Sequence, residues 1–190
     1  AGAVGYRALK LTGIEDRQLL GLTGFGGSGH LVLQMAKHRF PNGKVFVFAR
    51  SARERSFALE LGADWAGDTH DAPPVSADAI IDTTPAWSPV LAALIALKPG
   101  GRLVINAIRK EAGDNAVLTD IDYARHLWME KEIKSVANVT ARDLREFLVL
   151  AADIPLRPVV ESFPLEAAND VLQRLKAGHI RGAYVLKIND

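Results

Sequence analysis

Short, nearly continuous apolar runs alternate with amphipathic stretches along the first 139 residues of the chain. Runs of this kind are typical of parallel strands that are covered on both faces of a sheet. Strands and helices in regular alternation predict an α/β fold, with a doubly wound parallel sheet of about six strands and helices on both faces. Strands are expected at residues 18–24, 44–49, 77–82, 102–108 and 132–138, and helices at 30–40, 53–62 and 87–98.

The last part of the chain has a different pattern. Residues 140–143 (Thr-Ala-Arg-Asp) resemble a capping box with Asp in place of the usual Glu or Gln, which predicts a helix over 144–153. A strand, a helix and a strand are expected to follow at 158–163, 165–178 and 183–188. Because no flexible linker is visible, we expect residues 1–139 to form the main domain and residues 140–190 to pack against it.

Composition excludes several classes of protein. Lys and Arg number 23 against 22 Asp and Glu, without a block of like charge, which argues against nucleic-acid and anionic-membrane partners. The absence of cysteine rules out disulfides, thiolate metal sites and cysteine nucleophiles within these residues. The longest apolar stretch, 89–97, is far shorter than the roughly 20 residues of a membrane span. No signal peptide is visible, so we expect a soluble, cytoplasmic protein.

A glycine-rich segment joins the first predicted strand to its helix. Gly24, Phe25, Gly26, Gly27, Ser28 and Gly29 form the pattern G-x-G-x-x-G. In such a loop the first glycine permits a tight turn, the second lets the backbone approach a pyrophosphate, and the third lets the helix pack closely on the strand. The helix N-terminus then faces the anion. The position between strand and helix favours a Rossmann-type dinucleotide site; a turn that serves packing alone is the alternative.

The end of the second strand bears on the choice of cofactor. NAD-binding folds usually place Asp or Glu about 20 residues after the glycine loop, where it binds the ribose hydroxyls. Here that position is Ala49, followed by Arg50, Ser51 and Arg53. Arginine can bind a 2′-phosphate with two hydrogen bonds, whereas a carboxylate would repel it. The segment therefore favours NADP over NAD, unless the arginines simply begin a solvated helix.

Several segments together resemble the nucleotide-binding portion of zinc-type alcohol dehydrogenases, in the medium-chain dehydrogenase/reductase superfamily. The resemblance covers nearly all 190 residues and is most distinctive at 59–64 (LELGAD) and 165–186. It also includes a helix over 1–10 and the segments 22–29, 77–85 and 97–108.

The resemblance implies a two-domain enzyme that transfers hydride between an alcohol, aldehyde or ketone and a nicotinamide cofactor. In this family a barrel-like N-terminal domain carries the catalytic zinc and a Rossmann domain carries the cofactor. The chain matches the second domain, and the family's third zinc ligand, usually a cysteine, would fall directly before Ala1. Zinc is therefore implied for the full-length enzyme, while the chain alone is expected to be inactive. A homodimer is a possible assembly of the enzyme.

The resemblance also implies particular cofactor contacts. Gly26, Gly27 and Ser28 match the pyrophosphate loop, and Ala49, Arg50 and Ser51 match the segment that contacts the adenosine ribose. Contacts at the ends of later strands are implied for Thr83, Thr84, Asn106, Ala107, Ile108, Val136 and Asn138. The family often has a pyrophosphate-binding arginine just before the last strand. Ala183 stands there, so Arg181 is the candidate substitute.

Other polar residues are expected to be structural. The histidines (His30, His38, His70, His126 and His179) have no metal-ligand spacing, and Asp120 and Asp122 fit a helix cap better than a metal site. Core packing is the simplest role for Trp65, Trp87 and Trp128.

Two functions remain as alternatives to a dehydrogenase domain. One is a nucleotide-sensing Rossmann module without catalysis. The other is a methyltransferase, which is disfavoured because Leu22, Thr23 and Ala49 lack the acidic residues it needs.

Overall fold

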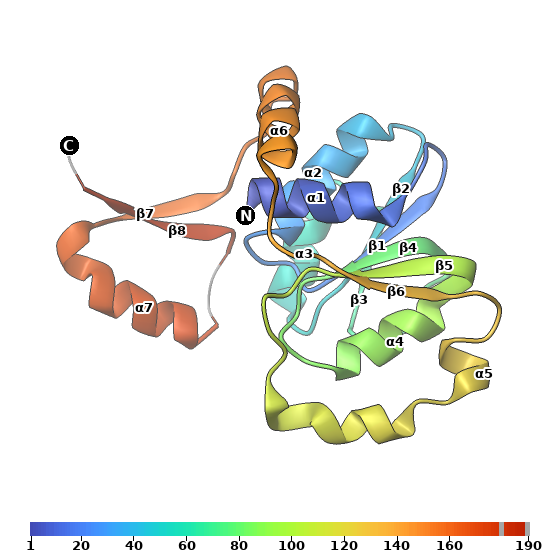
Figure 1. Ribbon diagram of the computed structural model, residues 1–190. Coiled ribbons are helices and arrows are strands. Elements are labelled where there is room, and N and C mark those ends of the chain that lie inside the picture. Colours follow the sequence, from blue (N-terminus) through green and yellow to red (C-terminus); the bar gives the residue numbers. More distant parts are fainter. Residues whose placement is uncertain (179–180, 189–190) are drawn as a thin grey trace.

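The computed structural model describes residues 1–178 and 181–188 and contains a six-stranded sheet of order β3-β2-β1-β4-β5-β6 (Figure 1). Every strand pairing in this sheet is parallel, which confirms the predicted doubly wound fold. The strands are β1 (Leu19–Thr23), β2 (Lys44–Phe48), β3 (Trp65–Gly67), β4 (Ala77–Asp82), β5 (Leu97–Ile105) and β6 (Glu132–Ser135).

Helices cover both faces of the sheet because its central strands present apolar side chains on each side. On one face Leu20 and Leu22 of β1 pack in a cluster with side chains of three helices. On the other face Leu19 packs with Phe46 and with residues of a fourth helix. This alternation along β1 is the two-residue period of a strand buried on both faces. The helices of the first face are α1 (Gly2–Thr12), α2 (Gly29–Arg39) and α3 (Ala52–Glu60), and that of the second is α4 (Ser88–Ala96).

The connection between β5 and β6 is long and contains η1 (Ala112–Asp120) and α5 (Tyr123–His126). Asp122 is the N-cap of α5 and accepts a hydrogen bond from the Arg125 N–H, as predicted. Asp120, in contrast, is the last residue of η1 and does not cap α5.

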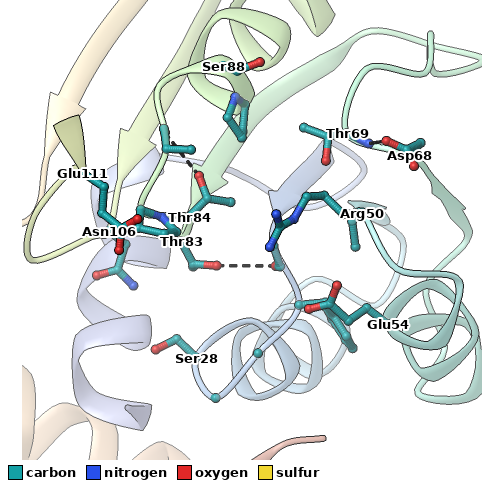
Figure 2. Close-up of a pocket in the computed structure, with 18 of the residues that line it drawn as sticks. Ser28, Arg50, Glu54, Asp68, Thr69, Thr83, Thr84, Ser88, Asn106 and Glu111 are labelled. Carbon is teal, nitrogen blue, oxygen red and sulfur yellow. Dashed lines mark hydrogen bonds between the residues drawn. The ribbon is translucent and has the colours of Figure 1, made fainter. Parts of the chain in front are cut away.

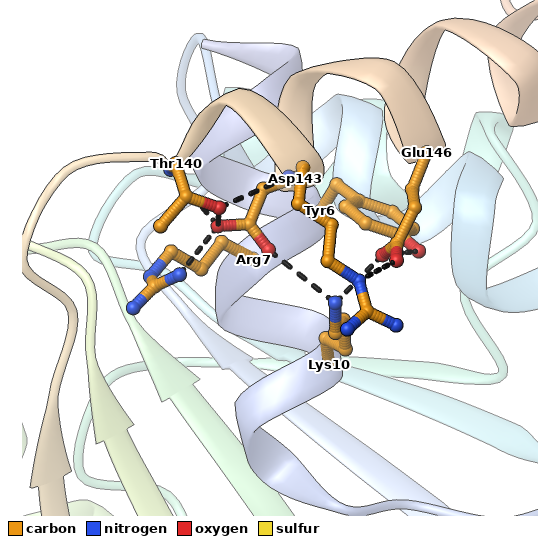
Figure 3. Close-up of polar contacts among 7 residues, drawn as sticks. Tyr6, Arg7, Lys10, Thr140, Asp143 and Glu146 are labelled. Atoms are coloured by element: carbon orange, nitrogen blue, oxygen red, sulfur yellow. Dashed lines mark hydrogen bonds and ion pairs between the residues drawn. The ribbon is translucent and has the colours of Figure 1, made fainter.

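The C-terminal part begins with α6 (Ala141–Asp153), which packs across α1 (Figure 3). Thr140 caps this helix and Asp143 completes the capping box, so Asp serves here in place of Glu or Gln. Asp143 also forms ion pairs with Arg7 and Lys10, and hydrogen bonds from Thr140 and Arg7 hold the pKa of Asp143 well below its ordinary value. Polar contacts of this buried carboxylate therefore join the first helix to the C-terminal part.

A small unit follows, with β7 (Val160–Pro164) and β8 (Ala183–Lys187) paired in parallel, and η2 (Leu165–Ala167) and α7 (Ala168–Lys176) between them. In Figure 1 this unit lies to one side of the six-stranded sheet. The segment just before this unit is hydrogen-bonded to α2. The side-chain amide of Gln34 donates to the Arg157 carbonyl oxygen and accepts a hydrogen bond from the Arg157 N–H. The division at residues 139 and 140 stays a prediction.

Several details differ from the sequence-based expectations: the strands expected at 102–108 and 132–138 end at Ile105 and Ser135, and the helix expected at 165–178 is divided into η2 and α7. Strand β3 was not expected, and α4 ends at Ala96 because Leu97–Gly101 already belong to β5. Trp65 and Trp87 pack against the apolar cluster around α4, but Trp128 is 53% exposed and its assignment to the core is wrong. Trp128 instead stacks edge-on against Tyr123 at the surface. His179 lies outside the described residues.

Candidate functional site

A pocket of about 810 Å³ opens at the carboxyl ends of β1, β2, β4 and β5 (Figure 2). Strand β1 lies between β2 and β4, so the strand order reverses beside this pocket, where open α/β sheets bind their ligands. More than half of the predicted cofactor contacts line it: Gly24, Phe25, Gly26, Gly27, Ser28, Ala49, Arg50, Thr83, Thr84 and Asn106.

The other predicted contacts lie outside the pocket lining. Gly29 begins α2, Ser51 caps α3, and Ile108 is 96% exposed. Gly29 has a packing role, since a Cβ atom there would lie 3.0 Å from the carbonyl oxygen of Gly24. The remaining residues that do not line the pocket are Arg53, Ala107, Val136, Asn138 and Arg181.

Arg181 is directed toward α3. Its guanidinium forms an ion pair with Glu60 and lies 4.4 Å from the centre of the Phe57 ring. Phe57 is buried and stacks edge-on with Phe25 of the glycine loop. The structure therefore brings Arg181 near the loop, through an aromatic pair, without bringing it into the pocket lining.

Within the glycine loop, Gly24 and Gly26 differ in the room that the structure leaves for a side chain. Gly24 has a left-handed backbone (φ +76°), and a Cβ atom there would lie 2.9 Å from Thr83 Oγ1. Gly26 is not left-handed, and a Cβ atom there would meet no atom within 4 Å, because it would point into open space. Gly24 thus shapes the turn, whereas Gly26 keeps part of the pocket free.

The start of α2 is suited to an anion. Ser28 precedes the helix and makes no side-chain capping bond. The His30 and Leu31 N–H groups donate to the Gly26 and Ser28 carbonyl oxygens, whereas the Gly27 and Ser28 N–H groups have no hydrogen-bond partner among the described residues. His30, in the first turn of the helix, is fully buried and its Nδ1 lies 3.0 Å from the Gly26 carbonyl oxygen. Its Nε2 accepts a hydrogen bond from the Val159 N–H, and burial lowers the pKa of His30. The imidazole therefore links the loop to the segment before β7.

Just after β2, the side chain of Arg55 is bound to other residues of the protein, whereas that of Arg50 is available to a ligand. Arg55 donates to the carbonyl oxygens of Ala49 (2.7 Å) and Arg50 (2.9 Å) and pairs with Asp68, which fixes the backbone here. The guanidinium of Arg50 has no hydrogen bond or ion pair with the described residues, and in Figure 2 this side chain extends into the pocket. Glu54 also lines the pocket, its carboxylate held 3.0 Å from Ser51 Oγ.

The sequence did not point to several lining residues that follow β3, β4 and β5. His70 Nε2 lies 2.7 Å from Ser88 Oγ, and this contact joins two walls of the pocket. Thr69, Pro85, Ala86, Pro89 and Glu111 also line it. Because β3 was not predicted, the sequence analysis did not place the loop after it, which includes Thr69 and His70, beside the pocket.

No group of three or more His, Cys, Asp or Glu side chains suited to a metal ion occurs within residues 1–178 and 181–188. These residues therefore do not fit a zinc site. In the same part of the chain, no helix has the length and apolar character needed to cross a membrane.

Comparisons with known proteins decide the family. The model of the family described as "Zinc-binding dehydrogenase" matches residues 27–153. The chain belongs to this zinc-binding dehydrogenase family. It is 40% identical over 188 residues to "Probable alcohol dehydrogenase AdhA" of Mycobacterium tuberculosis (strain CDC 1551 / Oshkosh), covering 99% of the chain and 52% of that protein. The chain thus spans about half the length of this relative, and its sequence-based assignment to zinc-type alcohol dehydrogenases is confirmed.

Solved structures of the same fold also match about half of their length. An alcohol dehydrogenase from Aeropyrum pernix superposes with a TM-score of 0.80 at 23% identity, over 96% of this chain and 54% of that one. CAD from Helicobacter pylori gives 0.81 at 21% identity, over 97% and 52%. Acetophenone reductase from Geotrichum candidum gives 0.78 at 23% identity, again over 97% and 52%. At these identities the superpositions support the fold.

Proposed function

We propose that the chain is the nicotinamide-cofactor-binding portion of a zinc-dependent alcohol dehydrogenase-like oxidoreductase. The observation that carries the proposal is the pocket at the switch point of the sheet, lined by Gly24–Ser28 and by the ends of β2, β4 and β5. The structures of similar fold include one described as in complex with NAD and one complexed with NADP(H). When bound, the nicotinamide would accept or donate the hydride exchanged with an alcohol or carbonyl substrate.

Two features of the pocket fit a dinucleotide. The open space above Gly26 and the N–H groups of Gly27 and Ser28, which have no partner among the described residues, suit a pyrophosphate, which needs close backbone approach and N–H donors. Asn106 lines the same pocket, and its Nδ2 atom is buried without a partner among the described residues. A buried donor without an acceptor is costly, and rotation of this amide toward the pocket would let a polar group of the ligand satisfy it.

The catalytic zinc belongs, in this proposal, to the part of the full-length enzyme outside the chain. The described residues contribute cofactor binding and orientation and supply no metal ligands. The chain alone should therefore oxidise no alcohol and reduce no ketone, while still binding cofactor.

We further propose a preference for NADP over NAD. Ala49 places no carboxylate at the ribose position, and the unpaired guanidinium of Arg50 lies at the same end of the pocket. A charge-assisted hydrogen bond contributes about 1.5–3 kcal/mol, or roughly ten- to a hundredfold in affinity. Glu54 opposes this preference from the pocket wall, but its carboxylate is engaged by Ser51.

The test is calorimetric titration of the chain with NADPH and NADH. Arg50→Ala should weaken NADPH binding about ten- to a hundredfold and leave NADH binding nearly unchanged, and Ala49→Asp should also weaken NADPH binding. Arg39→Ala is the matched control, because Arg39 is exposed at the far end of α2. Equal or tighter binding of NADH by the unaltered chain would contradict the preference, and absence of binding by both would contradict the proposed function.

A further inference from the structure

A buried ion pair lies directly behind the pocket. Asp82 is the last residue of β4 and is completely buried, and Lys110, in the segment that follows β5, pairs with it at 10% side-chain exposure. Asp82 further accepts hydrogen bonds from Thr23 Oγ1 (2.6 Å) and Thr84 Oγ1 (2.7 Å). The carboxylate thus gathers residues from the ends of two neighbouring strands, and Lys110 supplies the compensating charge.

Lys110 also holds backbone. Its ammonium donates to the carbonyl oxygens of Thr84 and Ala86, each at 2.9 Å. The next residue adds a further tie, since the Glu111 N–H donates to the Pro85 carbonyl oxygen at 2.7 Å. Two consecutive residues after β5, Lys110 and Glu111, are therefore hydrogen-bonded to the backbone of the segment after β4.

The fastened segments form one side of the pocket. Thr84, Ala86 and Glu111 line it directly. Thr83, beside them, donates to the Thr23 carbonyl oxygen (2.9 Å) and leaves no room for a side chain at Gly24. A displacement of residues 83–86 would consequently alter the turn of the glycine loop as well as the wall.

We propose that Lys110 is a positioning residue for the cofactor, one that fixes the pocket wall formed by residues 83–86 and 106–111. This inference rests on the proposed function, since it names how that site is kept in shape. Lys110 does not line the pocket, so it acts through the Asp82 carboxylate and the carbonyl oxygens of Thr84 and Ala86.

A second ion pair on the same strand provides a matched control. Lys98 donates to both oxygens of Asp78 (2.8 and 2.9 Å) near the start of β4, at the opposite end from Asp82. Lys98→Met and Lys110→Met each remove one lysine from an aspartate of β4. The Lys98 side chain is 41% exposed and that of Lys110 only 10%, so Lys98→Met should lower stability less than Lys110→Met. A positioning role is therefore recognised by a loss of cofactor affinity in folded Lys110→Met that Lys98→Met does not show.

The experiment compares binding of NADPH and of 2′,5′-ADP, which lacks the nicotinamide half, by Lys110→Met and Lys98→Met. Because removing one partner of a buried pair leaves an uncompensated charge, Lys110→Met is also made with Asp82→Asn. The double variant removes the uncompensated charge of Asp82. The hydrogen bonds from Lys110 to the Thr84 and Ala86 carbonyl oxygens are absent in it, as in Lys110→Met. Folding of each variant is checked by circular dichroism and thermal melting.

We expect NADPH affinity to fall at least tenfold in Lys110→Met and in the double variant. Affinity for 2′,5′-ADP should fall less than affinity for NADPH, because Arg50 at the β2 end, the proposed partner of its 2′-phosphate, lies outside residues 83–86 and 106–111. Lys98→Met should bind both ligands as the unaltered chain does. Unchanged NADPH affinity in a folded double variant overturns the inference, as does an equal loss in Lys98→Met. If the unaltered chain binds no nicotinamide nucleotide, the proposed function fails first and the inference falls with it.

Discussion

Replacing two glycines of the same loop should separate folding from ligand binding. Gly24→Ala places a Cβ atom on a left-handed residue, 2.9 Å from Thr83 Oγ1 and 3.1 Å from Thr84 Cγ2. Gly26→Val places its side chain in open space on a backbone that is not left-handed. The first change should therefore destabilise the fold, and the second should leave the fold intact and obstruct the pocket.

The magnitudes follow from these geometries. The left-handed backbone costs roughly 1–2 kcal/mol for alanine, and the contact with Thr83 adds about 1 kcal/mol because a hydrogen bond to the Thr23 carbonyl oxygen holds that hydroxyl. For a domain of this size the resulting 2–3 kcal/mol lowers Tm by about 4–12 °C. Gly26→Val should change stability by less than about 1 kcal/mol, since losing a glycine restricts the unfolded chain.

Thermal melting with and without NADPH measures both effects. At a ligand concentration near 100 times Kd, binding stabilises the unaltered chain by about 2.7 kcal/mol, which raises Tm by roughly 5–11 °C. Gly26→Val should melt like the unaltered chain without ligand and show little of this rise. A normal NADPH-induced rise in Gly26→Val would refute the placement of the pyrophosphate, and an unchanged Tm in Gly24→Ala would refute the argument from backbone and contact.

The remaining predictions concern α6 and its contacts. Thr140→Ala removes the cap of this helix and should lower stability by about 1 kcal/mol, whereas Thr140→Ser should keep most of it; urea unfolding measures both, and equal losses would contradict the cap. Hydrogen bonds from Lys10, Arg142 and Tyr6 hold the pKa of Glu146 at about 2, below its ordinary value of 4.5. A lowered carboxyl pKa stabilises the fold above about pH 4.5, and this contribution is lost as the pH falls toward 2. The urea midpoint should therefore drop more between pH 7 and pH 3 in the unaltered chain than in Glu146→Gln, and parallel drops would contradict the assignment.

The order of elements was predictable because each central strand is a continuous apolar run. Strand β1 is buried at every residue, and β4 was predicted with its observed bounds. Strand β3 was missed because it has three residues at the sheet edge and pairs with β2 alone. Trp128 was misassigned because composition does not reveal that an aromatic residue lies in a surface loop between α5 and β6.

Much of the pocket was predictable from the glycine spacing and the family resemblance. What these could not supply is the set of contacts between loops of different strands. Asp82 and Lys110 are 28 residues apart, and nothing in the local pattern around either indicates the other. Arg55 resembled its neighbours Arg50 and Arg53 in sequence, yet its direction toward the carbonyl oxygens of the β2 end depends on the fold.

Mapping NADPH onto the backbone amides of the chain by NMR tests the central claim most directly, and 20.5 kDa is a suitable size. The account predicts saturable shifts at Gly26, Gly27, Thr84 and Asn106, with little change at Gly100 and Gly101, which lie in the first half of β5, away from the carboxyl ends of the strands. Absence of shifts at millimolar NADPH, or shifts centred on Gly100 and Gly101, would contradict it.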